Sequence, residues 1–204
     1  MSTPAVDGRG ARGEATRERV LAAARDVILE RGFAKTSTRA VAERADVHLS
    51  LVHYHFGSKQ QLLIEVLEHQ NEALLERQRE LYAEPGPLAE KWRTACEFLD
   101  EDLRSGYVRV LWELWAAGLA DEMLAARWRE AMGEWRTLLE SVAADWLATL
   151  QESPPLSAKG LATLVTNLFQ GIEVELLARV GEEEASHREV LDALGDLIAR
   201  WERA

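Results

Sequence analysis

The sequence predicts an all-α protein with a small N-terminal domain of three helices and a larger helical C-terminal domain. Ala, Leu, Glu and Arg dominate its 204 residues, and runs of β-branched residues are scarce. This composition favours helices over strands. All five prolines fall in the N-terminal tail or in expected connections, where they end helices without interrupting them.

The first helix is expected to begin after Thr16, a candidate N-cap, and to end at Gly32. Residues 1–14 are small and polar without an apolar block, so we expect them to form a flexible N-terminal arm and no signal peptide. Between Thr16 and Gly32, one apolar stripe at helical spacing holds Val20, Ala23, Ala24, Val27 and Ile28.

Two shorter helices are expected next. Ser37 is a candidate N-cap for a helix through Ala45, the turn Asp46-Val47-His48 follows, and a third helix ends near Gly57. Two short helices joined by a three-residue turn are the outline of a helix-turn-helix. We therefore assign residues 15–60 to a helix-turn-helix domain and residues 61–204 to the larger domain.

A long helix should open the larger domain. Ser58 and Gln61 form a candidate capping box, in which the serine accepts from the backbone three residues on and the glutamine reaches back. The helix should run for about 25 residues, or roughly 37 Å, to Pro85-Gly86-Pro87. Further helices are expected from about Leu88 to Arg104, Tyr107 to Ala117, Ala120 to Gln151, Leu156 to Val180, and Glu184 to Arg203.

Charge is distributed unevenly along the chain. Residues 1–60 carry ten Lys or Arg against seven Asp or Glu, a net of +3, and the remainder carries a net of −14, which together give −11. A mildly basic N-terminal domain on an acidic body is compatible with nucleic-acid binding by the N-terminal domain alone. Cys96 is the one cysteine, and we interpret it as a core residue rather than a sensor thiol. No apolar run of about 20 residues is expected, so a cytoplasmic protein outside the membrane is predicted.

A set of short motifs runs through residues 32–63 in a fixed order: Gly32-Phe33, Thr36-Ser37-Thr38, Val41-Ala42-Glu43-Arg44-Ala45-Asp46-Val47, Val52-His53-Tyr54-His55-Phe56, Ser58-Lys59 and Leu62-Leu63. By these motifs the chain resembles the TetR/AcrR family of transcriptional regulators. The resemblance implies nine or ten helices, a homodimer, and a DNA-binding domain of three helices plus the start of the fourth.

The resemblance also implies which residues contact double-stranded DNA. Carried over position by position, the family's contacts fall on Thr38, His48, Leu49, Ser50, His53, Tyr54, His55 and Lys59. Val52 and Phe56, four residues apart, would anchor the recognition helix. The family commonly has a tyrosine at the position of His53 and a polar or basic residue at that of Leu49. The operator sequence is therefore not transferable from relatives.

Three histidines within eight residues, His48, His53 and His55, also suggest a metal site. Metal-binding histidines on one helix need spacings of three or four, whereas these are offset by five, two and seven. We therefore expect no metal and no cofactor. The alternative for His53 and His55 is a solvated or packing role.

Six of the seven tryptophans fall in the middle helices. Two explanations fit these tryptophans: an aromatic core, or the lining of a pocket for an aromatic, polycyclic or cationic effector. A pocket is what the family resemblance implies, so the expected ligand-binding residues are Trp92, Trp112, Trp115, Trp128, Trp135 and Phe169. Glu113 or Glu173 could pair with a ligand cation, and a salt bridge is the alternative for each.

The last two predicted helices carry apolar stripes that are expected to pair across a two-fold axis into a four-helix bundle. A palindromic DNA site needs two recognition helices, which favours this dimer over burial within a monomer. The expected dimerisation residues are Leu161, Leu164, Val165, Leu168, Ile172, Leu194, Ile198 and Trp201.

We therefore expect a repressor that an effector releases from its operator, with the long helix from Ser58 to Tyr82 acting as a lever. An enzyme is disfavoured, because the chain has no Gly-x-Ser-x-Gly elbow, phosphate loop or clustered Ser, His and Asp. A DNA-binding protein whose body senses a protein partner, or nothing, is the second alternative. Such a body would have no open apolar cavity.

Overall fold

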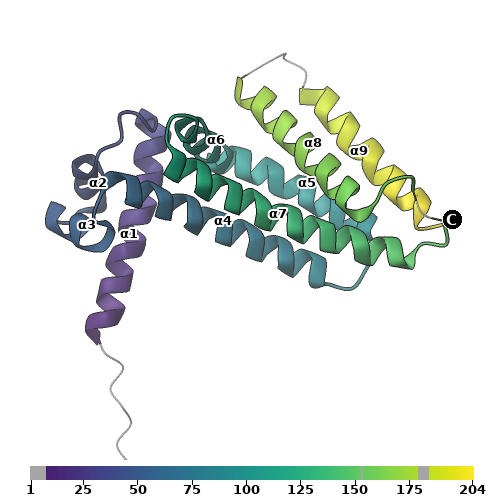
Figure 1. Cartoon of the computed structure of the whole chain (residues 1–204), viewed down its shortest axis with the longest axis horizontal. Helices are drawn as coiled ribbons and strands as arrows, with labels where there is room; N and C mark the ends of the chain where they lie inside the picture. Colours follow the sequence, from purple (N-terminus) through teal and green to yellow (C-terminus); the bar gives the residue numbers. More distant parts are fainter. Residues whose placement is uncertain (1–7, 153, 179–183) are drawn as a thin grey trace, which may run out of the picture.

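In the computed structural model, which describes residues 8–152, 154–178 and 184–204, every regular element is a helix (Figure 1). The all-α prediction is confirmed for these residues. Helices α1 (Gly8–Arg31), α2 (Thr38–Ala45) and α3 (Leu49–Phe56) form a head at one end of the molecule. The remaining helices form an elongated body: α4 (Lys59–Ala83), α5 (Leu88–Ser105), α6 (Tyr107–Gly118), α7 (Glu122–Thr149), α8 (Ala158–Ala178) and α9 (Glu184–Trp201).

Helix α1 is longer than the sequence predicted. Residues 8–14, which we expected in the flexible arm, are helical, and residues 1–7 lie outside the described residues. Thr16 is not an N-cap; its hydroxyl donates to the backbone carbonyl of Arg12, one turn earlier, at 2.9 Å. Ala, Arg and Glu have high helix propensities, and they outweigh the cost of three glycines in these turns.

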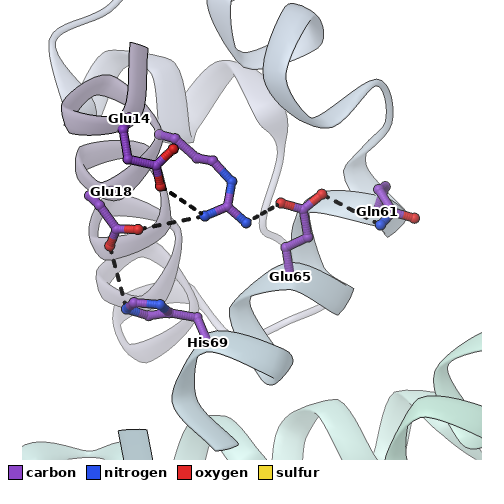
Figure 2. Close-up of polar contacts among 6 residues, drawn as sticks. Glu14, Glu18, Gln61, Glu65 and His69 are labelled. Carbon is purple, nitrogen blue, oxygen red and sulfur yellow. Dashed lines mark hydrogen bonds and ion pairs between the residues drawn. The ribbon is translucent and has the colours of Figure 1, made fainter. Parts of the chain in front are cut away.

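A cluster of charged side chains joins α1 to α4. The guanidinium of Arg17 lies 2.9 Å from Glu65 on α4 and within 3.6 Å of Glu14 and Glu18 on its own helix. Oε2 of Glu18 also lies 3.6 Å from Nε2 of His69 on α4, and Figure 2 shows Glu14 and Glu18 of α1 facing Glu65 and His69 of α4. Anchoring Arg17 to α4 stabilises the early turns of α1.

The expected caps of the next three helices are present. The hydroxyl of Ser37 accepts from the backbone three residues on at 3.2 Å, and Asp46 ends α2 in the left-handed conformation at φ 51°. Ser58 accepts from the backbone N–H of Gln61 at 3.0 Å. The second half of the predicted capping box is wrong, because the Gln61 side chain donates to Glu65 instead, at 3.5 Å.

Two body helices start later than predicted, and each has a local cap that explains its start. Asp121 accepts from the backbone N–H groups of Met123 and Leu124, so α7 begins at Glu122. Ser157 accepts from the N–H of Gly160 at 3.1 Å, so α8 begins at Ala158. The predicted end of α8 at Val180 falls outside the described residues.

The body is layered, with α5 and α7 between α4 on one side and α8 and α9 on the other (Figure 1). Helix α8 packs along α7, and α9 packs along α5. The α5–α9 contact is tight: the indole N–H of Trp92 donates to the carbonyl of Leu191 at 2.8 Å, and a Cβ on Gly195 would lie 3.0 Å from the Trp92 ring.

Helix α8 differs from one expectation. By length and composition alone it is long and apolar enough to cross a membrane, with a mean hydropathy of 1.2, so the prediction that no apolar run approaches this length was wrong. Its inner face packs in the body through Ala162, Thr166 and Ile172. Only 17% of its most apolar 18-residue stretch is buried, so the outer face of α8 is apolar and largely uncovered.

Candidate DNA-binding face and ligand cavity

Helix α3 has one buried and one exposed side. Val52 and Phe56 are 0% and 3% exposed and seat the helix on the head core, as predicted. Ser50, His53 and Tyr54 point to solvent, and Tyr54 is 81% exposed. The helix therefore presents hydroxyl and imidazole groups on an anchored scaffold, which is the side-chain chemistry that contacts bases and phosphates.

The histidines of this face also hold the helix ends. His48 is the N-cap of α3, and its Nδ1 lies 3.3 Å from the backbone nitrogen of Ser50. Nδ1 of His53 lies 3.2 Å from the carbonyl oxygen of Gly57 just past the helix. The ring of His55 stacks edge-on against Tyr54 at 5.2 Å. These contacts orient the rings on the exposed side.

Two leucines of α3 differ in exposure from what the sequence predicted. Leu49, a predicted DNA contact, is partly buried and packs against the core, whereas Leu51 is 40% exposed. Helical spacing places Leu51 off the buried stripe of Val52 and Phe56, and this spacing was the signal that could have predicted its exposure. Leu51 is therefore the apolar side chain of α3 that is more accessible to a bound duplex.

Thr38 and Lys59 lie at helix N-termini, as expected for phosphate contacts. Thr38 is the first residue of α2, and Lys59 is the first residue of α4. The ammonium of Lys59 lies 3.4 Å from the carbonyl oxygen of Phe33 and 5.4 Å from its ring centre. Lys59 is thus held beside the turn that joins α1 to α2.

Further contacts tie the head and the first turn of α4 to the rest of the body. The backbone N–H of Phe33 donates to Oε2 of Glu113 on α6. The side-chain amide of Gln60 donates to Asp121 at 2.5 Å. The α5–α6 turn at Gly106 approaches α1 so closely that a Cβ there would lie 2.6 Å from Leu29 Cδ2.

A cavity of about 70 Å³ lies inside the body, with walls from α4, α5, α6, α7 and α8. Four of the six predicted ligand-binding residues line it: Trp92, Trp128, Trp135 and Phe169. Trp112 and Trp115 are not in its wall. Trp112 instead packs behind Trp128, with ring centres 5.9 Å apart, and Trp115 packs on Trp112 at 5.2 Å.

Most of the polar side chains that line this cavity were not predicted from the sequence; they include Asn71, Gln78, Asp102 and Thr166. Gln78 and Thr166 are 5% and 0% exposed, and Gln78 Oε1 and Thr166 Oγ1 have no hydrogen-bond partner among the described residues. Asn71 and Gln78 interrupt the apolar stripe of α4 at a spacing of seven, which was the available signal. Buried polar atoms without partners are costly, so they point to a ligand or water in this cavity.

Glu173 contributes a carboxylate to the same wall. The indole N–H of Trp112 donates to its Oε2 at 2.9 Å. Burial raises the pKa of Glu173 to about 7, the Trp112 hydrogen bond opposes this, and the nearby Asp102 charge adds to it. Glu173 forms no ion pair with any residue that the structure describes.

Glu113, the other candidate for a ligand cation, has a structural role. Its carboxylate accepts from Phe33 and lies 3.3 Å from Nε of Arg109 on the same helix. It does not line the cavity. The alternative salt-bridge interpretation therefore applies to Glu113 and not to Glu173.

A second, apolar cavity of about 190 Å³ opens between α8 and α9. Most of the predicted dimerisation residues line it: Leu161, Leu164, Val165, Leu168, Leu194, Ile198 and Trp201. The remaining one, Ile172, is 4% exposed and packs in the core of the single chain, so little of its side chain is available to a second copy. Leu164 and Leu197 are 48% and 47% exposed at the rim.

Cys96 is 5% exposed, and burial raises the pKa of its thiol to about 12. The thiol stays protonated near neutral pH, because the thiolate is disfavoured in an apolar environment. The interpretation of Cys96 as a core residue is confirmed.

Comparison with known proteins gives the following similarities. Residues 20–66 match the family model described as bacterial regulatory proteins, tetR family. The chain is 27% identical over 168 residues to the HTH-type transcriptional regulator Rv2912c of Mycobacterium tuberculosis, covering 80% of this chain and 83% of that one. It is 50% identical over 50 residues to the HTH-type transcriptional repressor Rv3405c of the same species, covering 24% and 27%.

Solved structures share the fold. A transcriptional regulator from Saccharomonospora viridis in complex with choline is 20% identical, with a TM-score of 0.71 over 91% of this chain and 96% of that one. At this identity the likeness shows the fold alone, from the head through the last body helices.

Proposed function

We propose that this chain, which belongs to the TetR/AcrR family of DNA-binding transcriptional regulators, is a repressor that binds a palindromic operator as a homodimer and is released by a small molecule. Its fold and relatives are those of transcriptional regulators and not of enzymes. The observation that carries the proposal is the cavity whose wall includes α4, the same helix that begins at the head.

The head is the proposed DNA-binding domain. The exposed residues of α3, above all Ser50, His53 and Tyr54, are proposed to read base edges, while Thr38 and Lys59 position the phosphates. The head is the positively charged part of a chain with a net charge of −11. This distribution orients the head, and not the body, toward a duplex.

The outer face of α8 and α9 is the proposed dimer interface. Its apolar rim at Leu164 and Leu197 is half exposed in one chain, and a Cβ on Gly171 would meet no atom within 4 Å. A second copy would cover this face and bring two heads together. Operators with two half-sites one helical turn apart, about 34–36 Å, need such a pair of heads.

We propose that ligand binding shifts α4 and α6, and that these helices transmit the shift to the head and release the DNA. Asn71 and Gln78 of α4 line the cavity, and the same helix runs without a break to Lys59 beside the head. On α6, Glu113 holds the N–H of Phe33. A ligand that shifts either helix moves the head, and the coupling must be reciprocal, so operator DNA weakens ligand binding by the same factor.

The alternative, a DNA-binding protein whose body senses a protein partner or nothing, predicted a body without an open cavity. The aromatic cavity with unpartnered Gln78 and Thr166 supports the small-molecule ligand instead. The Saccharomonospora viridis regulator, which shares this fold, was solved in complex with choline, and this is consistent with a small-molecule ligand in the present body.

The test is selection of bound sequences from a random DNA pool, followed by measurement of affinity for the selected site. We expect a palindrome, two chains per site, and an affinity that falls by about 10³-fold between 50 and 200 mM salt. No enrichment, or a site bound by one chain, would contradict the proposal. Glutamate substitutions at the α8–α9 rim separate loss of dimerisation from loss of DNA contacts.

A further inference from the structure

We infer, on the basis of the proposed function, that the effector is a compact organic cation whose positive charge lies against Glu173 and whose apolar part lies among the aromatic rings of the cavity. The class of ligand follows from the charges, rings and unpartnered atoms in the wall.

The charged groups of the wall are carboxylates. Asp102 and Glu173 line the cavity, and its described lining contains no Lys, Arg or His. Asp102 is already neutralised by Arg77, whose guanidinium lies 2.5 Å from it. Among the described residues, Glu173 accepts only the hydrogen bond from the Trp112 N–H and has no cationic partner. A ligand cation would supply the missing countercharge, whereas an anion would find no positive partner.

The hydrogen-bond acceptors in the wall also favour a cationic ligand. Gln78 Oε1 and Thr166 Oγ1 are buried without a hydrogen-bond partner in the part of the chain that the structure describes, and an ammonium group or its polarised methyl groups could approach both. An amine with N–H donors would satisfy them directly. An uncharged apolar ligand would leave these atoms unpaired, at a cost typical of buried polar groups.

Aromatic rings surround the carboxylate. Trp92 and Phe169 meet edge-to-face with centres 5.6 Å apart, and Trp128 and Trp135 complete the lining from α7. The negative faces of such rings attract organic cations, and the attraction increases where water is excluded. The acidic body, with a net charge of −14 over residues 61–204, raises the local concentration of cations.

The size of the cavity limits the ligand. A single water needs only about 10–15 Å³, so a cavity of about 70 Å³ takes several non-hydrogen atoms and not a large planar drug. Small tetraalkylammonium and alkylammonium ions meet this limit.

The pH dependence of cation affinity tests whether Glu173, and not another part of the cavity, attracts the ligand. The groups that face it are Trp112 on α6 and Asp102 on α5, with Arg77 on α4 paired to Asp102 and the neutral phenol of Tyr107 nearby. The pKa of Glu173 is about 7 in the unliganded protein. A permanently charged ligand should therefore bind about tenfold more tightly at pH 8 than at pH 6, following the ionised fraction.

The experiment uses three probes of similar shape: tetramethylammonium, neutral tert-butanol and anionic pivalate. Their binding to the full chain without DNA is followed by tryptophan fluorescence and ligand-observed NMR. We expect the cation to bind at least tenfold more tightly than either other probe at pH 8. Glu173→Gln should abolish this preference and the pH dependence. Glu140→Gln, the same change at an exposed glutamate on α7, should leave both unchanged.

Equal affinity for the cation and tert-butanol, or an unchanged preference in Glu173→Gln, would overturn the inference while leaving a ligand cavity and the proposed function standing. Failure of all three probes to bind would also overturn it. If Glu173→Gln does not fold, the pH profile of the wild-type chain decides, since flat affinity between pH 6 and pH 8 excludes Glu173. Operator binding by the ligand-free protein tests the proposed function separately.

Discussion

The indole N–H of Trp112 donates to the carboxylate of Glu173 at 2.9 Å and joins α6 to α8 beside the cavity. The next residue along α6, Glu113, accepts from the backbone N–H of Phe33 in the head. Two consecutive residues therefore contact the cavity carboxylate and the head. This gives a path of direct contacts from the cavity to the head, beside the path along α4.

The first prediction concerns stability and pH. The pKa of Glu173 is about 7 in the folded chain, above its ordinary value of 4.5. The folded chain therefore holds this proton more tightly than the unfolded chain. The stability it contributes is complete below about pH 4.5 and is lost as the pH rises through 7.

Glu173→Gln removes this titration, so the stability of the variant relative to wild type should increase by up to about 3 kcal/mol between pH 5 and pH 8, at about 1.4 kcal/mol per pKa unit. Urea unfolding of both chains across this range measures the difference. Glu140→Gln, at an exposed glutamate on α7, is the control and should show the same pH dependence of stability as the wild type. A constant difference between Glu173→Gln and wild type would show that Glu173 titrates normally.

The second prediction concerns Glu113. Replacing it with alanine leaves the N–H of Phe33 without its acceptor and should lower the free energy of unfolding by about 1–2 kcal/mol. Arg109→Ala removes only the exposed partner of Glu113 and should cost less than about 0.5 kcal/mol. Equal losses in urea unfolding would mean that the contact with the head contributes nothing beyond the surface ion pair.

The third prediction compares two glycines. Gly106 has φ 78°, and a Cβ there would lie 2.6 Å from Leu29, so Gly106→Ala should destabilise the chain by about 1–3 kcal/mol. Gly133 lies in the exposed middle of α7, where a Cβ meets nothing within 4 Å. Gly133→Ala should stabilise it by about 0.5–1 kcal/mol. Thermal unfolding that gave both variants the same sign would contradict the close approach of the α5–α6 turn to α1.

The fourth prediction concerns DNA contact. Tyr54 is 81% exposed, so Tyr54→Ala should leave the melting temperature unchanged. It should weaken binding to the selected operator by about tenfold or more, because a base contact typically contributes about 1–3 kcal/mol. Leu156→Ala, an exposed apolar residue of the body, is the control. Wild-type operator affinity in Tyr54→Ala would remove this residue from the interface.

The fifth prediction concerns the dimer. Leu164→Glu and Leu197→Glu place charges on the exposed rim of the α8–α9 cavity, so each should produce a folded monomer with unchanged helical content. Met123→Glu changes an equally exposed apolar residue on α7 and should remain dimeric. Light scattering after size-exclusion chromatography measures the mass. Dimers in both rim variants would place the interface elsewhere.

Much of the head could be predicted from the sequence because local rules specify it. Ser37 and Ser58 cap their helices through contacts within three residues, and Asp46 ends α2 through its own backbone conformation. The start of α1 was missed for a different reason. Residues 8–14 lack the apolar stripe that predicted the other helices, and the contact of Arg17 with Glu65, 48 positions away, cannot be identified from the local pattern.

Local pattern and composition therefore determined the helical class, the N-caps Ser37 and Ser58, and the exposed side of α3. Only the tertiary structure decided which tryptophans line the cavity, because facing a cavity depends on the helix packed opposite and not on spacing within one helix. The same is true of the two glutamates. Glu113 and Glu173 are indistinguishable in the sequence, but packing places one against the backbone of the head and the other, without a cationic partner, in the aromatic cavity.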